Sequence, residues 1–171
     1  MRKISKDGLT AILKSERVSL RLIKSLRFTP DKVQYLECRE MLAIDNRSSS
    51  EGVLIIDLDG FYVLPYILNK SLVDPSTGRL KSVICDFCCT WQKGGKGSFI
   101  TFTRKNDKHS FTFITCEDLF CSLHIRNLTD EAMLSRTQLR EDIDTGGRIA
   151  RHKKRLLGIL ETIQQEPIKG V

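Results

Sequence analysis

The fold class follows from two short stretches, Cys85-Asp86-Phe87-Cys88 and, after 27 intervening residues, Cys116-Glu117-Asp118-Leu119-Phe120-Cys121. Zinc in a structural site takes four ligands in a tetrahedron, and cysteine sulfur is among those it prefers. Two cysteine pairs at these spacings predict one structural Zn²⁺ bound by Cys85, Cys88, Cys116 and Cys121. Four sulfur ligands close the coordination shell, so no position is left for a catalytic water.

The residues around the cysteines predict a treble-clef arrangement. A short strand over Arg79–Ile84 delivers the first pair on a tight knuckle. Alternating residues over Ser98–Arg104 and Ser110–Thr115, with a turn at Asn106-Asp107, predict a hairpin. A helix from about Cys116 to Arg126 then carries the second pair, where its N-terminal N–H groups stabilise thiolate charge.

Other roles for these cysteines remain open. The first pair is also the spacing of a redox motif, but such a motif begins a helix and here a hairpin follows. Core packing is a second alternative. His109 and His124 offer nitrogen ligands for a mixed site, although we expect His124 to point away from the metal. Cys89 is expected to be a bystander or an occasional substitute ligand.

The first 45 residues predict helices. Apolar residues recur with a helical period, and a cap at Thr29-Pro30-Asp31 starts a further helix. That helix places Tyr35, Cys38 and Leu42 on one stripe, so Cys38 is interpreted as a core residue. The polar segment Asn46–Glu51 follows and is the predicted linker.

Beyond the linker the period changes to that of strands. Val53–Leu58 and Phe61–Leu68 predict a hairpin with a type I′ turn at Asp59-Gly60. Pro65 places the second strand at an edge or a bend. A loop is expected at Asp74–Gly78.

The C-terminal part is again helical in pattern. A cap at Thr129 starts one helix, Gly146-Gly147 interrupts the pattern, and a last helix carries an apolar stripe. Each single-striped helix must bury that stripe, so we expect the N-terminal and C-terminal helices to pack together. The stripe of the last helix consists of Ile149, Leu156, Leu160 and Ile163.

The predicted fold class is therefore α+β: a treble-clef zinc finger with antiparallel hairpins, beside a small bundle of the N-terminal helices and the C-terminal helix. The predicted division is a helical part, 1–50, joined by helix 144–171, and an α/β zinc-binding domain, 51–143. No stretch is apolar enough to span a membrane, and no secretory signal is visible. A cytoplasmic protein without a membrane partner is expected.

The net charge of +7 is unevenly distributed. Residues 1–50 hold 11 Lys/Arg against 6 Asp/Glu (+5), residues 51–143 hold 11 against 12 (−1), and residues 144–171 hold 6 against 3 (+3). Basic ends suit RNA or an acidic protein, or simply keep the protein soluble.

The segment from Thr115 to Arg126, Thr-Cys-Glu-Asp-Leu-Phe-Cys-Ser-Leu-His-Ile-Arg, resembles a known signature. It is similar to Cys-x-Asp-Leu-x-Cys-Ser-Leu-Tyr-x-Arg of the FusB-type elongation factor G-binding proteins. Gly78-Arg79-Leu80 and the knuckle after it also match, and the resemblance covers roughly residues 53–143. It implies a helical bundle joined to an α/β zinc domain, with the four cysteines at the family's zinc ligand positions.

The resemblance also implies a function. Such proteins bind elongation factor G and, in resistance proteins, help it leave ribosomes stalled by fusidic acid; they are not enzymes and need no small-molecule substrate. Two departures are visible. His124 stands where many members have Tyr, and the N-terminal helical part is short beside the two-domain resistance proteins.

A partner-binding surface is expected beyond the knuckle. Its residues are Trp91, Lys93, Lys96, Phe99, Arg104, Lys105 and Arg126. An aromatic side chain with several cations suits contact with protein or RNA. The alternatives are that Trp91 packs under the knuckle and that Arg126 satisfies helix carbonyls.

Three functions are compared. The first is binding of elongation factor G, and the second is an RNA- or ribosome-binding zinc finger that uses the basic ends. The third, a treble-clef nuclease, lacks an acidic cluster beside His109 and His124.

Overall fold

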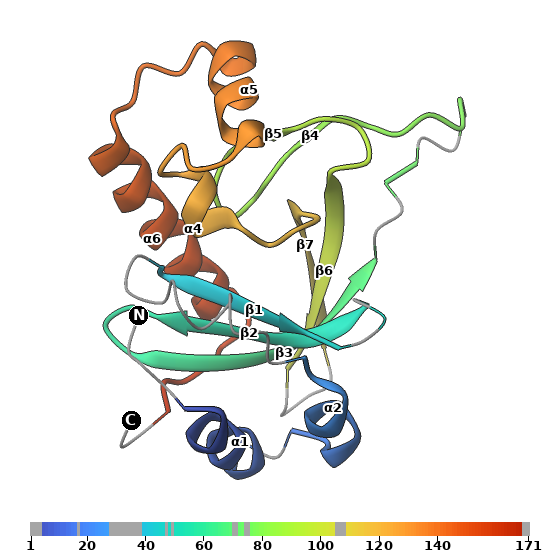
Figure 1. The fold of residues 1–171 in the computed structure, drawn as a ribbon, viewed down its shortest axis with the longest axis vertical. Helices are drawn as coiled ribbons and strands as arrows, with labels where there is room; N and C mark the ends of the chain where they lie inside the picture. Colours follow the sequence, from blue (N-terminus) through green and yellow to red (C-terminus); the bar gives the residue numbers. More distant parts are fainter. Residues whose placement is uncertain are drawn as a thin grey trace.

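The computed structural model describes residues 5–16, 18–27, 39–46, 48, 50–69, 72–73, 76–104 and 109–168 (Figure 1). Its centre is a five-stranded antiparallel sheet in the order β1-β2-β3-β6-β7. The strands are β1 (Met41–Asp45), β2 (Glu51–Asp57), β3 (Phe61–Asn69), β6 (Gly97–Thr103) and β7 (Ser110–Cys116). A separate pair is formed by β4 (Val83–Ile84) and β5 (Trp91–Gln92).

Both predicted hairpins are confirmed, as β2–β3 and β6–β7. The predicted type I′ turn is wrong. The loop between the paired residues Asp57 and Phe61 has three residues, and neither Asp59 nor Gly60 has a positive φ. Pro65 lies in the part of β3 that has β2 as its neighbour but no β6 residue opposite, which is where a missing N–H is tolerated.

The N-terminal helices are α1 (Lys6–Ser15) and α2 (Leu20–Ser25), capped by the hydroxyls of Ser5 and Ser19. The prediction that a helix continues through Leu42 is wrong, because Met41–Asp45 is β1 and pairs along β2. The rest of that predicted helix, with Cys38, lies outside the described residues.

The segment predicted as a linker connects β1 and β2. The Asn46 N–H donates to the Glu51 carbonyl at 2.8 Å, closing the loop of this hairpin. The predicted boundary between residues 50 and 51 therefore falls within one sheet, which takes strands from both sides of it.

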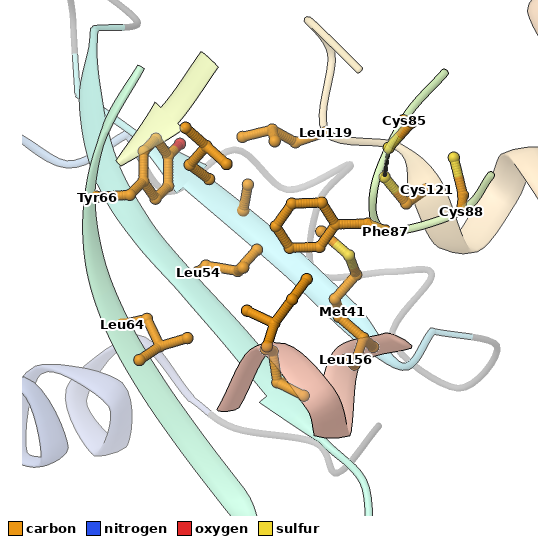
Figure 2. Close-up of a cluster of buried hydrophobic side chains, with 14 of the residues drawn as sticks. Met41, Leu54, Leu64, Tyr66, Cys85, Phe87, Cys88, Leu119, Cys121 and Leu156 are labelled. Carbon is orange, nitrogen blue, oxygen red and sulfur yellow. Dashed lines mark hydrogen bonds between the residues drawn. The ribbon is translucent and has the colours of Figure 1, made fainter. Parts of the chain in front are cut away.

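The two sides of the sheet carry separate cores. Alternation along β1 and β2 turns Leu42, Ile44, Val53 and Ile55 toward α1, while Met41, Leu54 and Ile56 point to the other side. On that other side lie the cysteine-bearing loops and α6 (Thr145–Thr162). Figure 2 shows Phe87 reaching from the knuckle into this second core, near Met41 and Leu156.

The predicted bundle of N-terminal and C-terminal helices is therefore wrong. The stripe of α6, including Leu156 and Leu160, packs in one core, and Leu9 and Leu13 of α1 pack in the other, with the sheet between them (Figure 1). An apolar stripe predicts that a helix is buried on one side, but it does not predict which of the two faces of the sheet covers it.

The remaining helices are α4 (Cys121–His124) and α5 (Asp130–Leu139). The predicted helix from Cys116 is shorter than expected, because Cys116 still belongs to β7. The Thr129 cap of α5 is confirmed, its hydroxyl accepting from the Ala132 N–H at 3.2 Å. Gly146 and Gly147 do not break a helix: they lie in the first turn of α6, capped by Asp144.

Within the described residues, no helix combines the length and apolar character that a membrane span requires.

Candidate metal centre

The β4–β5 hairpin presents the first cysteine pair in its turn. The Cys85 N–H donates to the Thr90 carbonyl at 3.0 Å, and the Cys89 N–H donates back to the Cys85 carbonyl at 2.9 Å. Cys89 has φ 57°, which turns the chain after the second ligand. The predicted strand before the knuckle is only Val83–Ile84, and Trp91-Gln92 is its partner strand.

The second pair comes from a strand end and a helix start. Cys116 is the last residue of β7 and Cys121 the first of α4, as the treble-clef prediction requires. Between them the Asp118 carboxylate accepts from the Phe120 N–H at 2.9 Å, and Leu119 has φ 56°. This tight loop brings the two sulfurs within 3.9 Å of each other.

The four sulfur atoms fit one tetrahedral zinc ion. All four cysteines are buried free thiols, and their Sγ atoms lie within 4.8 Å of one another. Cys85 and Cys121 are 3.7 Å apart, and Cys88 and Cys116 are 3.5 Å apart. A tetrahedron with Zn–S bonds of about 2.3 Å requires sulfurs about 3.8 Å apart. The half-buried Cys89 is not part of this cluster.

The electrostatics of the cluster favour a bound cation. Burial raises the pKa of the Cys116 thiol well above its ordinary value, and the neighbouring cysteines raise it further. At Cys88, burial is instead outweighed by hydrogen bonds from the other cysteines and His124, which lower the pKa of that thiol, so the buried thiols do not share one tendency to ionise. Zinc, when bound, supplies the positive charge that keeps them as thiolates and so links their loops.

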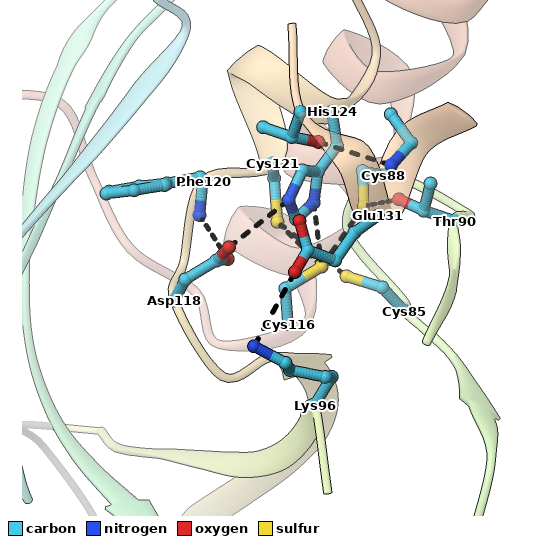
Figure 3. Close-up of polar contacts among 12 residues, drawn as sticks. Cys85, Cys88, Thr90, Lys96, Cys116, Asp118, Phe120, Cys121, His124 and Glu131 are labelled. Carbon is cyan, nitrogen blue, oxygen red and sulfur yellow. Dashed lines mark hydrogen bonds and ion pairs between the residues drawn. The ribbon is translucent and has the colours of Figure 1, made fainter. Parts of the chain in front are cut away.

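His124 lies beside this cluster, so the prediction that it points away is wrong. Its Nδ1 is 3.2 Å from the Cys116 sulfur and its Nε2 is 3.3 Å from the Asp118 carboxylate (Figure 3). The sequence did carry the signal, because residues three apart on a helix share a face and His124 follows Cys121 by three.

The charge of His124 follows from those neighbours. Burial alone would lower its pKa, but the Asp118 carboxylate and the Cys88 sulfur outweigh burial and raise that pKa to about 10. The imidazolium then donates to a ligand sulfur and faces a carboxylate. A partner of this kind orients a metal ligand and offsets the negative charge of a four-thiolate centre.

His152, on α6, forms a hydrogen bond to the backbone of the knuckle. It is 1% exposed, and its Nδ1 lies 2.8 Å from the Phe87 carbonyl between the first two cysteines. Burial lowers its pKa, so the neutral ring donates from Nδ1 to that carbonyl. This contact, not foreseen from the sequence, fixes α6 to the zinc site.

Arg126 joins the site to β1. It forms two hydrogen bonds of 2.9 and 2.7 Å to the Glu40 carboxylate and one of 2.7 Å to the Ser122 carbonyl. Burial alone would raise the pKa of Glu40, but its hydrogen bonds and the Arg126 charge lower it. The Ser122 hydroxyl also accepts from the Glu40 and Met41 N–H groups. Of the two roles considered for Arg126, this geometry fits the one in which its side chain donates to a helix carbonyl.

The other residues predicted to bind a partner do not share one surface. The backbone N–H of half-buried Trp91 donates to the Ser135 hydroxyl of α5, and the Lys96 ammonium lies 3.6 Å from the Glu131 carboxylate of the same helix. Lys93 is exposed nearby. Arg104 follows the opposite end of β6, about 20 Å from Gly97 along the strand.

Two further members of that set are placed differently. Phe99 is half-buried on β6, and Lys105 lies outside the described residues. The Arg104 guanidinium donates to the Thr162 carbonyl at 3.1 Å and stacks 4.9 Å above the Phe111 ring. Arg104 thus holds the end of α6 against the sheet.

A knuckle, a β-hairpin and a short helix around four cysteines define a treble-clef zinc finger. The model of one family, the FBP C-terminal treble-clef zinc-finger, matches residues 8–163. The chain belongs to this FusB-type family, and the cluster is its structural zinc site. The match extends beyond residues 53–143 and takes in α1 and α6. Neither a comparison with curated proteins nor one with solved structures returned a match.

Proposed function

We propose that this chain is a non-enzymatic protein that binds elongation factor G and promotes its release from the ribosome. The observation that carries the proposal is the family match over residues 8–163. The closed four-cysteine cluster supports it, because zinc in such a site organises a surface and has no position for a substrate. A role at the ribosome would place the protein in the cytoplasm.

The contact surface we propose is the unit of β4, β5 and α5, which the zinc site anchors. Helix α5 is held to β5 by the hydrogen bond between Trp91 and Ser135. Large apolar side chains are nevertheless exposed on this unit, including Ile84, Met133 and Leu134. Exposed apolar side chains on a rigid unit suit a protein partner. Trp91, Lys93 and Lys96, on or beside β5, stay in the proposed surface.

Binding is tested by titrating purified elongation factor G into the zinc-loaded chain by calorimetry. Met133, 55% exposed, is replaced by Asp, and we expect the affinity to fall by about tenfold or more. Leu20 on α2 is 61% exposed on the other side of the sheet, so Leu20→Asp is the matched control and should bind normally. No complex at micromolar concentration, with zinc present, would contradict the proposal.

Release is tested separately on ribosomes stalled by fusidic acid. Adding the chain should move elongation factor G from the pelleted ribosomes to the supernatant, and Met133→Asp should do so less well. A chain that binds the factor but leaves it on the ribosome would retain the first half of the proposal and remove the second.

An RNA- or ribosome-binding role is the second candidate. It is favoured by exposed cations on α6, Lys153, Lys154 and Arg155. Phosphate contacts release counterions, so binding to purified ribosomes would weaken steeply between 50 and 200 mM salt, on the order of a thousandfold for six or more contacts. Ribosome binding that needs elongation factor G and depends little on salt would favour the first proposal.

A further inference from the structure

The outer edge of β7 presents backbone groups that face away from the sheet. Ile114 pairs opposite Phe99 of β6, yet its N–H donates to the Asp86 carboxylate at 2.7 Å and its carbonyl accepts from the Asp86 N–H at 2.8 Å. The backbone of Ile114 therefore points outward. Directions alternate along an antiparallel strand, so Thr112 and Ser110 also turn their N–H and carbonyl groups outward.

The Ser110–Phe113 half of this edge lacks the usual protection against pairing. β7 is the last strand of the sheet, and the outward backbone hydrogen bonds found among the described residues lie further along it, where Ile114 bonds to Asp86 and the Cys116 carbonyl accepts from the Leu119 N–H at 3.1 Å. Ser110–Cys116 contains no proline and no charged residue, which are the features that normally prevent an edge strand from pairing. The side chains of Ser110 and Thr112 are exposed.

A groove of about 650 Å³ lies beside this edge. Phe113 of β7 and Ile159 of α6 line it with apolar surface, and Lys154 and Arg155 line it with positive charge, while its third cation, Arg151, is ion-paired with Glu141. Its one acidic residue, Asp86, is held by the Ile114 N–H. The groove therefore suits a chain with apolar and acidic side chains.

Gly158 keeps the groove open. It lies inside α6, where glycine costs about 1 kcal/mol relative to alanine. A Cβ built at this position meets no atom within 4 Å, so packing does not require glycine there. The helix therefore carries a destabilising residue at a position where a larger side chain would project into the groove.

We infer that the edge of β7 and this groove together bind an extended acidic segment of a partner protein by strand addition. The segment pairs its backbone with Ser110 and Thr112 and turns alternate side chains toward Lys154 and Arg155. Outward backbone donors and an apolar floor suit a peptide better than a nucleic-acid phosphate chain. The inference does not depend on elongation factor G being the source of the segment.

The test uses the full zinc-loaded chain and a fluorescein-labelled peptide, Glu-Val-Glu-Ile-Glu-Val-Glu. We expect saturable binding by fluorescence anisotropy and, by NMR, slowed exchange and shifted resonances of the Ser110 and Thr112 amides. The same peptide N-methylated at alternate residues keeps its charge and loses backbone donors. Two such peptides are compared, one methylated at odd residues and one at even residues, because only one of these sets of N–H groups faces β7. Methylation of that set should weaken binding by about tenfold or more.

Three variants test the groove, each checked for zinc content. Lys154→Glu should weaken binding several-fold, whereas Lys153→Glu, the same charge change outside the groove, should not. Gly158→Leu should keep or raise the melting temperature, since it improves helix propensity, and should weaken binding at least fivefold.

Four results would overturn the inference: no binding of the peptide, equal effects of Lys154→Glu and Lys153→Glu, unchanged binding to Gly158→Leu, or no effect of N-methylation in either register. Oligouridine of 12 nucleotides that binds the same groove, while the peptide does not, would replace it with a phosphate-binding site.

Discussion

The two faces of the sheet are stabilised by different kinds of contact. On the α1 face the contacts are between apolar side chains such as Leu13, Val53 and Phe61. On the other face the apolar core is accompanied by polar bonds between distant segments, including His152 to Phe87 and Arg126 to Glu40. The cysteine cluster lies on that second face only.

This contrast locates the part of the structure that depends on metal. The α1 face needs only that its side chains exclude water, as in any small core. The other face places loops with short strands, β4 and β5, and a four-residue helix, α4, into fixed positions. Such elements are too short to be stable alone, so their order must come from zinc and from the polar bonds around it.

The largest expected effect is loss of zinc itself. Cys88→Ser removes a buried ligand, and we expect the zinc content measured by mass spectrometry to fall from one ion per chain to well below one. Structural zinc contributes about 10 kcal/mol or more of apparent binding energy in small domains, so the stability loss should be several kcal/mol. Circular dichroism during chelation should report the same loss in the wild-type chain.

The adjacent cysteine is the control for this prediction. The sulfur of Cys89 lies outside the cluster, so Cys89→Ser should keep one zinc ion and change the stability by less than about 0.5 kcal/mol. If both serine variants lost zinc alike, the ligand assignment would be wrong.

Leucines on the two faces allow a direct comparison. Leu156 of α6 and Leu13 of α1 are both fully buried, and each change to Ala should cost about 3 kcal/mol in urea unfolding. Only Leu156→Ala should also weaken zinc binding, because Leu156 packs in the core shared with the cysteine loops. An equal loss of zinc affinity in both variants would show that the two faces are one unit.

The sequence was most informative where chemistry is local. Ligand spacing predicted the gathering of Cys85, Cys88, Cys116 and Cys121, and residue alternation predicted both hairpins. A short apolar run is ambiguous, so β1 at Met41–Asp45 was mistaken for helix.

Tertiary placement was less predictable. The stripe of α6 required burial, but nothing local said which face of the sheet would supply it. The bonds of Arg126 and His152 join residues 86 and 65 positions apart, and single-sequence patterns carry no such information.

An effect of at most the same size is expected at the ion pair that joins the start of β1 to the zinc finger. Arg126→Ala leaves the Glu40 carboxylate, 7% exposed, without its cation, and should cost about 3 kcal/mol in urea unfolding. The double variant Glu40→Gln/Arg126→Met removes both charges and should recover much of that loss. A double variant as unstable as Arg126→Ala would show that packing, not the unpaired charge, sets the cost.

The smallest effect is expected at His124, and it depends on pH. His124→Gln removes the cation beside Cys116, and zinc affinity measured by competition with a chelator should fall by about tenfold. The folded pKa of about 10 lies above the unfolded value near 6.5, so the protonated ring stabilises the fold. That contribution is complete below pH 6.5 and is lost as the pH rises toward 10.

The stability difference between wild type and His124→Gln should therefore shrink between pH 7 and 10. Comparing the two proteins at each pH cancels the titration of groups away from His124, and excess zinc holds the Cys88 sulfur, whose pKa His124 lowers, as a thiolate in both. A difference that stays constant over this range would mean that His124 acts through shape alone. Because the α1 face holds no such group among its described core residues, Leu13→Ala should show a pH-independent difference from wild type. The two faces of the sheet would then differ in the pH dependence of their stability, because only one of them contains the charged His124 ring.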